Sequence, residues 1–281
     1  MLIEVRGPVR NGISISMDRI EEKVPSLLVT ESKLRRALRH DEFFLVYQPI
    51  INLLTRRITG VEALIRWQQP DGSCLLPSSF IPLAEKTGII APIGEWVLRT
   101  ACNQTADFIR ALGAPLSLAV NLSPRQLREN SLLENISQIL DETGFDPKLL
   151  ELEITEGLLL DNGQATENTI RQLRKMGIKI VLDDFGSGYS GLGYLKRFPI
   201  DRLKIDRSFV ADIEKDLPLT AAVIQLGHNL KIQVTAEGVE TPEQWQFLLE
   251  HGCDDAQGYH LAMPMNAEDL IDYLAAKWPV T

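Results

Sequence analysis

Apolar runs of strand length recur along the chain from residue 43 to residue 261, separated by polar turns or by longer segments of helical period. Such runs predict strands, and their alternation with helices predicts an α/β fold. The predicted strands are Phe43–Ile50, Ile58–Trp67, Leu116–Asn121, Leu149–Thr155, Lys179–Asp184, Arg202–Asp206, Gln233–Glu237 and the shorter, more polar Asp255–Leu261.

Helices are predicted where apolar residues recur at a spacing of three or four positions. Ser123-Pro124 is a helix start, because serine caps the first turn and proline is favoured at its first position. The turn Leu53–Arg57 is too short for a helix, so the first two strands are predicted to be antiparallel. The predicted helices are Thr30–His40, Pro77–Thr87, Ile93–Leu112, Ser123–Glu142, Ala165–Met176, Pro218–Leu230, Pro242–His251 and Asn266–Trp278.

Strands that mostly alternate with helices predict a TIM-like (β/α)8 barrel, here with an antiparallel first strand. An open doubly wound sheet is the alternative. The barrel is favoured because polar residues end nearly every strand. A closed barrel gathers all of those ends at one mouth, whereas an open sheet gathers only those near its switch point. Residues 1–25 are weakly patterned and are interpreted as a linker or the tail of a preceding module, with the barrel in residues 26–281.

The polar side chains at the strand ends are almost all oxygen donors. Asp183 and Asp184 are adjacent carboxylates, and keeping both ionised beside a core requires a compensating cation. Oxygen ligands without histidine or cysteine favour Mg²⁺ or Mn²⁺ over Zn²⁺ or copper. Two such ions sharing one carboxylate are the usual device for phosphoester cleavage. The strand-end residues are Gln48, Glu62, Asn121, Glu153, Asp183, Asp184, Lys204, Glu237 and Gln257.

Each of these residues also has an ordinary structural interpretation. A single glutamate at a strand end is more often a helix cap or an ion-pair partner than a metal ligand. Asn121 is placed to cap the helix that follows it, and Lys204 has Asp201 and Asp206 as pairing partners nearby. The functional interpretation rests on the coincidence of such residues on six strands.

Composition narrows the expected partners and location. The 281 residues are 44% hydrophobic and carry a formal net charge of -9, which disfavours a long nucleic acid as the partner. The three cysteines, Cys74, Cys102 and Cys253, form no CxxC pair and indicate a reduced cytoplasm. No apolar run reaches the roughly 20 residues of a membrane span. We expect no membrane contact by this segment, which is cytoplasmic or the cytoplasmic domain of a larger, membrane-bound protein.

A series of short motifs follows in the order found in one known family. The stretch Val61–Trp67 contains Glu62-Ala63-Leu64, which resembles the signature of the EAL-domain cyclic di-GMP phosphodiesterases. The resemblance extends from about Glu31 to Asp272. The other motifs are Tyr47-Gln48-Pro49, Asn121-Leu122-Ser123, Glu151–Glu156, Asp183–Gly186, Lys204-Ile205-Asp206, Ala236–Thr241 and Gln257-Gly258-Tyr259.

This resemblance implies a TIM-like barrel that hydrolyses cyclic di-GMP to the linear dinucleotide pGpG with two ions of Mg²⁺ or Mn²⁺. Asp183 would bridge the two ions, with Asp184 beside the second. Ca²⁺ is expected to inhibit, because a larger and loosely coordinated ion misplaces the attacking water. The implied metal-site residues are Glu62, Asn121, Glu153, Asp183, Asp184, Glu237 and Gln257.

The resemblance also implies roles beyond metal ligation. Glu237 would act as ligand or as general base for water, Lys204 would orient that water or stabilise charge on the phosphate, and Glu62 completes the catalytic set. Gln257 would support water on the metal. The implied substrate contacts are Gln48, Leu64, Arg66 and Pro264.

The glycine-rich stretch after the aspartates resembles the family's regulatory loop, which links the catalytic acids to a dimer interface. A homodimer is therefore implied, and Glu240 matches the glutamate that anchors the loop. Gly157 stands where the family usually has serine, and no departure removes a predicted ligand. The loop residues are Phe185, Gly186, Ser187, Gly188, Tyr189 and Ser190.

Other interpretations of the same residues remain open. A receptor would bind cyclic di-GMP without cleaving it, and would be expected to lack a ligand. A Mg²⁺-dependent lyase acting on a phosphorylated sugar would need no groove for two guanines. Gly186–Gly191 matches a dinucleotide-binding GxGxxG, but the aspartate pair would aim negative charge at a pyrophosphate. His40-Asp41 has no other histidine suitably spaced for a metal site.

Overall fold

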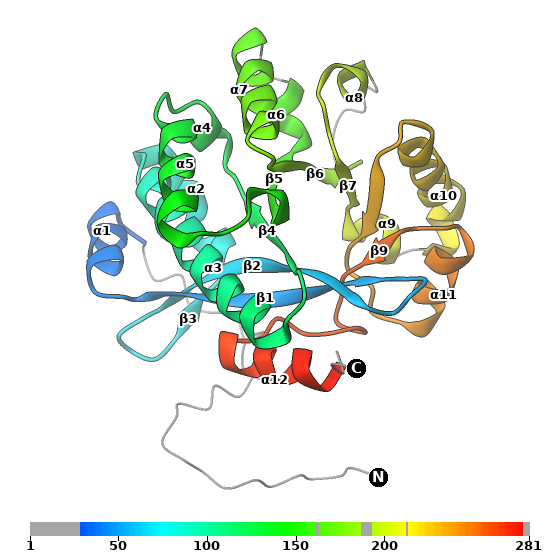
Figure 1. Cartoon of the computed structure of the whole chain (residues 1–281), viewed down its shortest axis with the longest axis horizontal. Coiled ribbons are helices and arrows are strands. Elements are labelled where there is room, and N and C mark those ends of the chain that lie inside the picture. Colours follow the sequence, from blue (N-terminus) through cyan, green and yellow to red (C-terminus); the bar gives the residue numbers. More distant parts are fainter. Residues whose placement is uncertain (1–28, 161–162, 187–192, 212, 278–281) are drawn as a thin grey trace, which may run out of the picture.

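The computed structural model describes residues 29–160, 163–186, 193–211 and 213–277 (Figure 1). The interpretation of residues 1–25 as a linker lies outside these residues. Within them, no helix combines the length and the apolar character that crossing a bilayer requires.

The strands form one closed barrel with helices around it (Figure 1). Their order is β1-β9-β8-β7-β6-β5-β4-β2, and pairing between β1 and β2 closes the ring. The short β3, Cys74–Leu75, only extends the end of β2. The barrel strands are β1 Phe43–Asn52, β2 Ile58–Gln68, β4 Ser117–Asn121, β5 Leu150–Thr155, β6 Lys179–Phe185, β7 Arg202–Ile205, β8 Gln233–Ala236 and β9 Asp255–Ala256. The predicted TIM-like barrel is confirmed.

The antiparallel first strand is also confirmed. β1 runs antiparallel to both of its neighbours, β2 and β9, whereas all other neighbouring pairs of barrel strands are parallel. The turn after β1 is fixed by Asn52, whose Oδ1 accepts the Thr55 N–H at 2.9 Å, and by Arg56 at φ 57°. Because the turn is tight, β2 folds directly back on β1 and brings Gln48 opposite Glu62.

The last predicted strand is much shorter than expected. Only Asp255–Ala256 pairs with β8, because the chain turns away at Gly258. A Cβ at Gly258 would lie 2.2 Å from the backbone N and O of Val239, so only glycine allows this close approach. The Leu261 and Ala262 N–H groups then bond back to the Gly258 carbonyl at 3.0 Å, which makes a turn where a strand was predicted.

The helices agree broadly with the predicted pattern, with shifted ends. The segment predicted as Ser123–Glu142 forms two helices, and the helix predicted from Pro218 begins earlier and contains that proline. The helices are α1 Glu31–Arg39, α2 Ile81–Thr87, α3 Ile90–Leu112, α4 Pro124–Leu127, α5 Leu132–Thr143, α6 Glu156–Leu160, α7 Gln164–Lys175, α8 Gly193–Arg197, α9 Arg207–Ala211, α10 Ile213–Asn229, α11 Pro242–Glu250 and α12 Ala267–Lys277, with 3-10 turns at Pro77–Ser79 and Pro147–Leu149.

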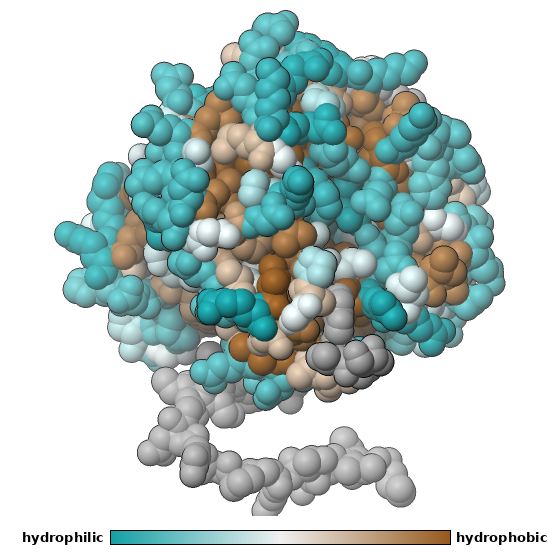
Figure 2. Space-filling model, in the orientation of Figure 1, coloured by the Kyte–Doolittle hydropathy of each residue, from teal (hydrophilic) through white to brown (hydrophobic). Residues whose placement is uncertain are grey.

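The apolar core lies mainly outside the barrel wall, beneath the helices. Trp67 is fully buried there, with its ring centroid 5.5 Å from Phe43 and 5.6 Å from Phe80. Hydrophilic residues dominate the rim of the face in Figure 2, and apolar residues show between the helices near its centre. Inside the barrel, by contrast, several strands carry buried charged side chains, so the interior is where chemistry is expected.

Candidate active site

The barrel brings the predicted ligands to one mouth. Side chains two positions apart on a strand share a face, and the carboxyl ends of parallel strands meet at one end of a barrel. Asn121 at the end of β4 is paired in register with Glu153 on β5. Glu237 and Gln257 directly follow β8 and β9.

Lys204 lies at the centre of this group and is 1% exposed. Its Nζ lies 2.8 Å from Glu153 Oε1, 2.5 Å from Glu237 Oε1 and 3.4 Å from Glu62 Oε2. Asp183 Oδ1 is 3.7 Å away. Burial alone would lower the pKa of Lys204, but the surrounding carboxylates raise it well above its usual value, so the lysine stays charged. Its ion-pair partners are thus the mouth carboxylates, not the sequence neighbours that offered the ordinary explanation.

Glu62 is held by two amides. Its Oε1 accepts from Asn121 Nδ2 at 2.8 Å, and its Oε2 accepts from Gln257 Nε2 at 2.7 Å. The same Gln257 nitrogen lies 2.9 Å from Gln48 Oε1. Burial raises the pKa of Glu62, but Lys204 and the two amides outweigh burial and lower it overall. Glu62 is therefore an ionised carboxylate in a fixed orientation.

The remaining carboxylates repel one another. Burial and then the charge of Glu62 raise the pKa of Glu153 well above its usual value, although Lys204 opposes this. Burial, Asp183 and Glu62 raise the pKa of Glu237 to about 7, again against Lys204. Negative charge is thus in excess at the mouth.

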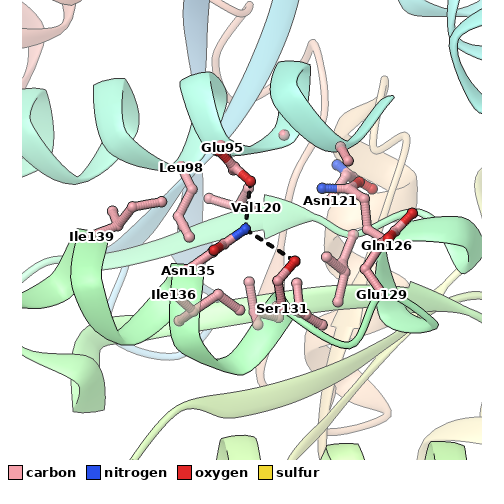
Figure 3. Close-up of a pocket in the computed structure, with 15 residues that line it drawn as sticks. Glu95, Leu98, Val120, Asn121, Gln126, Glu129, Ser131, Asn135, Ile136 and Ile139 are labelled. Atoms are coloured by element: carbon pink, nitrogen blue, oxygen red, sulfur yellow. Dashed lines mark hydrogen bonds between the residues drawn. The ribbon is translucent and has the colours of Figure 1, made fainter. Parts of the chain in front are cut away.

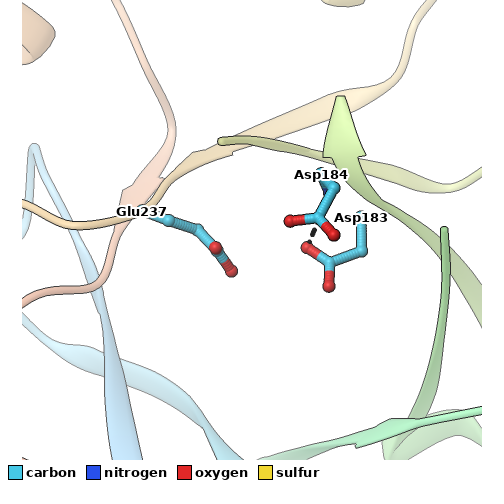
Figure 4. A group of neighbouring side chains, drawn as sticks. All are labelled: Asp183, Asp184 and Glu237. Atoms are coloured by element: carbon cyan, nitrogen blue, oxygen red, sulfur yellow. Dashed lines mark hydrogen bonds between the residues drawn. The ribbon is translucent and has the colours of Figure 1, made fainter. Parts of the chain in front are cut away.

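The aspartate pair directs two adjacent carboxylates into the same space. In a regular strand they would point to opposite faces, but the pairing of β6 with β7 shifts register between Leu182 and Phe185. Asp184 takes a left-handed backbone at φ 55°, and its N–H donates to Asp183 Oδ1 at 2.9 Å. Carboxylate oxygens of Asp183, Asp184 and Glu237 lie within 4.8 Å of one another (Figure 4).

These side chains fit divalent cations. Five carboxylates against one ammonium give the mouth a formal charge of −4, which two divalent ions would balance. Glu153 Oε2 and Gln257 Oε1 are buried oxygens without a hydrogen-bond partner among the described residues. Unsatisfied buried acceptors of this kind are costly unless a cation or water meets them. The donors are all oxygens, as Mg²⁺ and Mn²⁺ prefer.

The predicted substrate contacts flank this cluster. Leu64 and Arg66 follow Glu62 on the same face of β2, and both are partly buried. Gln48 Nε2 donates to the Ala262 carbonyl at 3.1 Å, which holds the segment after Gly258 against β1. Pro264 is buried next to Met265, whose backbone bridges Tyr47.

One buried residue near the loop was given no role by the sequence analysis. Glu156 is 3% exposed, and its Oε2 accepts the Gly186 N–H at 3.3 Å. Its position directly after β5, three residues beyond Glu153, was the available signal. Glu240, the predicted loop anchor, is exposed, and its N–H donates to Gln244 Oε1. Ser187–Ser190 lie outside the described residues.

A cavity of about 40 Å³ lies behind Asn121, between α3, β4, α4 and α5 (Figure 3). Its lining is largely apolar. Two of its polar lining residues bond to each other, because Asn135 Nδ2 donates to Glu95 Oε1 at 2.5 Å. This volume suits one or two waters and excludes a nucleotide. The carboxylate mouth is the candidate active site because it gathers the charged oxygen groups, not because of its volume.

Comparisons with known proteins agree with this geometry. The EAL domain family matches residues 31–264. Cyclic di-GMP phosphodiesterase NbdA of Pseudomonas aeruginosa is 38% identical over 270 residues, which are 95% of this chain and 34% of NbdA. Cyclic di-GMP phosphodiesterase PdeR of Escherichia coli is 36% identical over 261 residues, which are 92% of this chain and 39% of PdeR.

Solved structures show the same architecture. The PaMucR phosphodiesterase in complex with c-di-GMP superposes with a TM-score of 0.81 and 41% identity, over 85% of this chain and 98% of that one. The chain spans about a third of the length of the curated relatives it matches. The family match covers most of the chain, and the chain belongs to the EAL domain family.

Proposed function

We propose that this chain hydrolyses cyclic di-GMP to linear pGpG with two divalent cations. The observation that carries the proposal is the convergence of four carboxylates on one buried lysine at the barrel mouth, with a fifth, Asp184, beside two of them. Relatives named as cyclic di-GMP phosphodiesterases support the choice of substrate.

Two overlapping groups of ligands would hold the cations. Glu62, Asn121, Glu153 and Asp183 would hold one; Asp183, Asp184 and Glu237 would hold the other, with Gln257 supporting water. Bound Mg²⁺ or Mn²⁺ would supply a water of lowered pKa and neutralise charge on the phosphate. The larger Ca²⁺ is expected to bind and inhibit.

The chain's own groups would handle the proton and the substrate. Glu237 would take a proton from the attacking water; without bound ions its pKa is raised to about 7, and bound cations would lower it. As a phosphorus–oxygen bond forms to that water, the opposite phosphorus–oxygen bond breaks, the ring opens, and the leaving oxygen becomes a hydroxyl by taking a proton from solvent. Lys204 remains positively charged and would orient the water or stabilise the phosphate oxygens.

Substrate binding is assigned to Gln48, Leu64, Arg66 and Pro264. Arg66 is partly buried on the same face of β2 as Glu62, and its guanidinium can contact a phosphate by two parallel hydrogen bonds. We further propose a homodimer regulated by the loop at Phe185–Ser190, with Glu240 and Glu156 as its anchors. The chain is expected to work in the cytoplasm, alone or as the cytoplasmic domain of a larger protein.

Cleavage of cyclic di-GMP tests the proposal. The chain is mixed with the nucleotide and Mg²⁺ or Mn²⁺, and pGpG is followed by chromatography. Asp183→Asn and Glu62→Ala should abolish cleavage, while Asp107→Asn, which alters an exposed acid on α3, should retain it. Binding without cleavage by the wild type would instead indicate a receptor. Neither binding nor cleavage would favour an unrelated barrel enzyme.

A further inference from the structure

A second ionic group lies inside the barrel at the end opposite the mouth. We call it the basal cluster, and it consists of Glu151, Lys179, Arg202 and Asp255. Arg202 Nε is 3.1 Å from Glu151 Oε2, and Arg202 Nη1 pairs with Asp255 Oδ2. Lys179 Nζ is 3.1 Å from Glu151 Oε1. Glu151 and Asp255 are 1% and 2% exposed, and Arg202 is 7% exposed.

Arg202 connects its strand, β7, to two strands with which β7 shares no backbone hydrogen bonds. Its strand, β7, pairs with β6 and β8, whereas Glu151 is on β5 and Asp255 is on β9. Nη1 also donates to Thr235 Oγ1 at 2.8 Å, and Nη2 donates to Gln233 Oε1 at 3.3 Å, both on β8. The planar guanidinium therefore fixes three other strands from inside the barrel, in a geometry that its rigid fork defines.

The basal cluster shares its strands and faces with the mouth ligands. Positions two apart on a strand point to the same side. Glu151 precedes Glu153 by two residues, and Arg202 precedes Lys204 by two. Asp255 likewise precedes Gln257 by two residues. On β5, β7 and β9, each residue of the Arg202 ion pairs is therefore followed, two positions later and on the same face, by a mouth residue.

We propose that Arg202, with Glu151 and Asp255, is a positioning group for the metal site: it holds β5, β7 and β9 at the spacing at which Glu153, Lys204 and Gln257 serve one cluster. This inference rests on the proposed metal site. The mouth carboxylates repel one another and tend to spread their strands before an ion binds. The basal ties oppose that spreading, which keeps the ligands preorganised for ions.

The test compares two matched double variants. Arg202→Met with Asp255→Asn removes the basal fork while leaving net charge unchanged and Glu151 paired with Lys179. The control is Arg174→Met with Asp201→Asn, which removes an Arg–Asp pair on the outside of the barrel, at 2.7 Å, by the same substitutions. Binding of Mn²⁺ alone is measured by titration calorimetry without nucleotide, and folding is followed by circular dichroism.

The basal variant should bind Mn²⁺ about tenfold more weakly than the wild type, because loss of residues that orient metal ligands typically lowers metal affinity by about that factor. The control should bind within about twofold of the wild type, although its melting temperature also falls. Unchanged Mn²⁺ affinity in a folded basal variant would overturn the proposal, as would an equal loss in the control. A wild type that binds no Mn²⁺ would instead overturn the proposed function.

A milder variant decides the matter if the basal double variant does not fold. Arg202→Lys keeps the charge but loses the fork, so it cannot reach Glu151 and Asp255 together. Its Mn²⁺ affinity should fall at least about threefold, while affinity equal to that of the wild type would contradict the positioning role.

Discussion

At the base of the barrel, two buried carboxylates meet two basic side chains, whereas at the mouth a single lysine contacts four carboxylates and a fifth lies beside them. The two groups share strands β5, β6 and β7, and each has a fully buried member, Glu151 at the base and Lys204 at the mouth. At the base each of the four charged side chains has an oppositely charged partner, although Arg202 Nε lacks a hydrogen bond of good geometry among the described residues. The mouth is incomplete, because carboxylates outnumber cations and buried acceptor oxygens lack partners among the described residues.

This difference distinguishes a group of charged side chains with a structural role from one with a functional role. A buried group with equal numbers of positive and negative side chains is costly to break, but it does not need a bound cation. An unbalanced one destabilises the empty protein and gains by binding cations, which is how a site can select an ion. In this chain, the excess of carboxylates over cations distinguishes the mouth from the base, whereas burial and charge are common to both.

The largest effect is expected from removing a charge at the mouth. Asp183→Asn deletes the proposed shared ligand and should lower the cleavage rate by at least about 1,000-fold, or about 4 kcal/mol of transition-state stabilisation. The same change relieves repulsion, so the metal-free protein should melt at an unchanged or higher temperature. A large drop in metal-free melting temperature would contradict the contrast with the base.

Removing a charge at the base should have the opposite signature. Arg202→Met leaves Asp255 buried without its cation and Glu151 with Lys179 as its remaining partner, and should lower the free energy of unfolding by about 3 kcal/mol, measured by urea denaturation. A loss below about 1 kcal/mol would show that the two ends do not differ as described. Arg174→Met, at an exposed pair, is the control and should cost about 1 kcal/mol or less.

Bound Mn²⁺ should stabilise the folded protein through the mouth residues and not through other sites. Mn²⁺ at about 100 times its dissociation constant should add about 2.7 kcal/mol to the unfolding free energy, seen as a raised melting temperature. Asp183→Asn should lose most of that gain, while the exposed-pair control should keep it. An equal gain in Asp183→Asn would show that Mn²⁺ binds elsewhere.

The smallest effect is expected at the turn that leads from β9. Gly258→Ala places a Cβ against the Val239 backbone and should lower stability by about 1–2 kcal/mol. Because Gln257 is its neighbour, Mn²⁺ affinity should also fall, by about threefold. Gly72→Ala is the control: it adds a Cβ to another glycine, at φ 87° in an open turn, and should leave Mn²⁺ affinity unchanged. Loss of stability without loss of Mn²⁺ affinity would show that the turn at Gly258 does not position Gln257 for metal binding.

Much of the fold was accessible from the sequence because its causes are local. The tight turn at Leu53–Arg57 forces the antiparallel start, and apolar runs set the strands. The short β9 was missed because it depends on Gly258 meeting Val239, a contact between different segments. Likewise, the left-handed backbone of Asp184 depends on the shifted pairing of β6 with β7.

The candidate site was predictable in its residues but not in its contacts. Carboxylates at strand ends point to one mouth once the barrel closes. That Lys204 meets Glu62, 142 positions away, and not Asp206 is decided by barrel closure alone. The basal cluster was missed because Glu151, Arg202 and Asp255 each resemble an ordinary charge at the start of a strand.

The proposed metal site can be seen by anomalous diffraction from crystals soaked in Mn²⁺. We expect two Mn²⁺ peaks at the mouth, one contacting Glu62, Asn121 and Glu153, the other contacting Asp184 and Glu237, with Asp183 between them. A mouth without Mn²⁺, with Lys204 still the only cation among the carboxylates, would contradict this expectation.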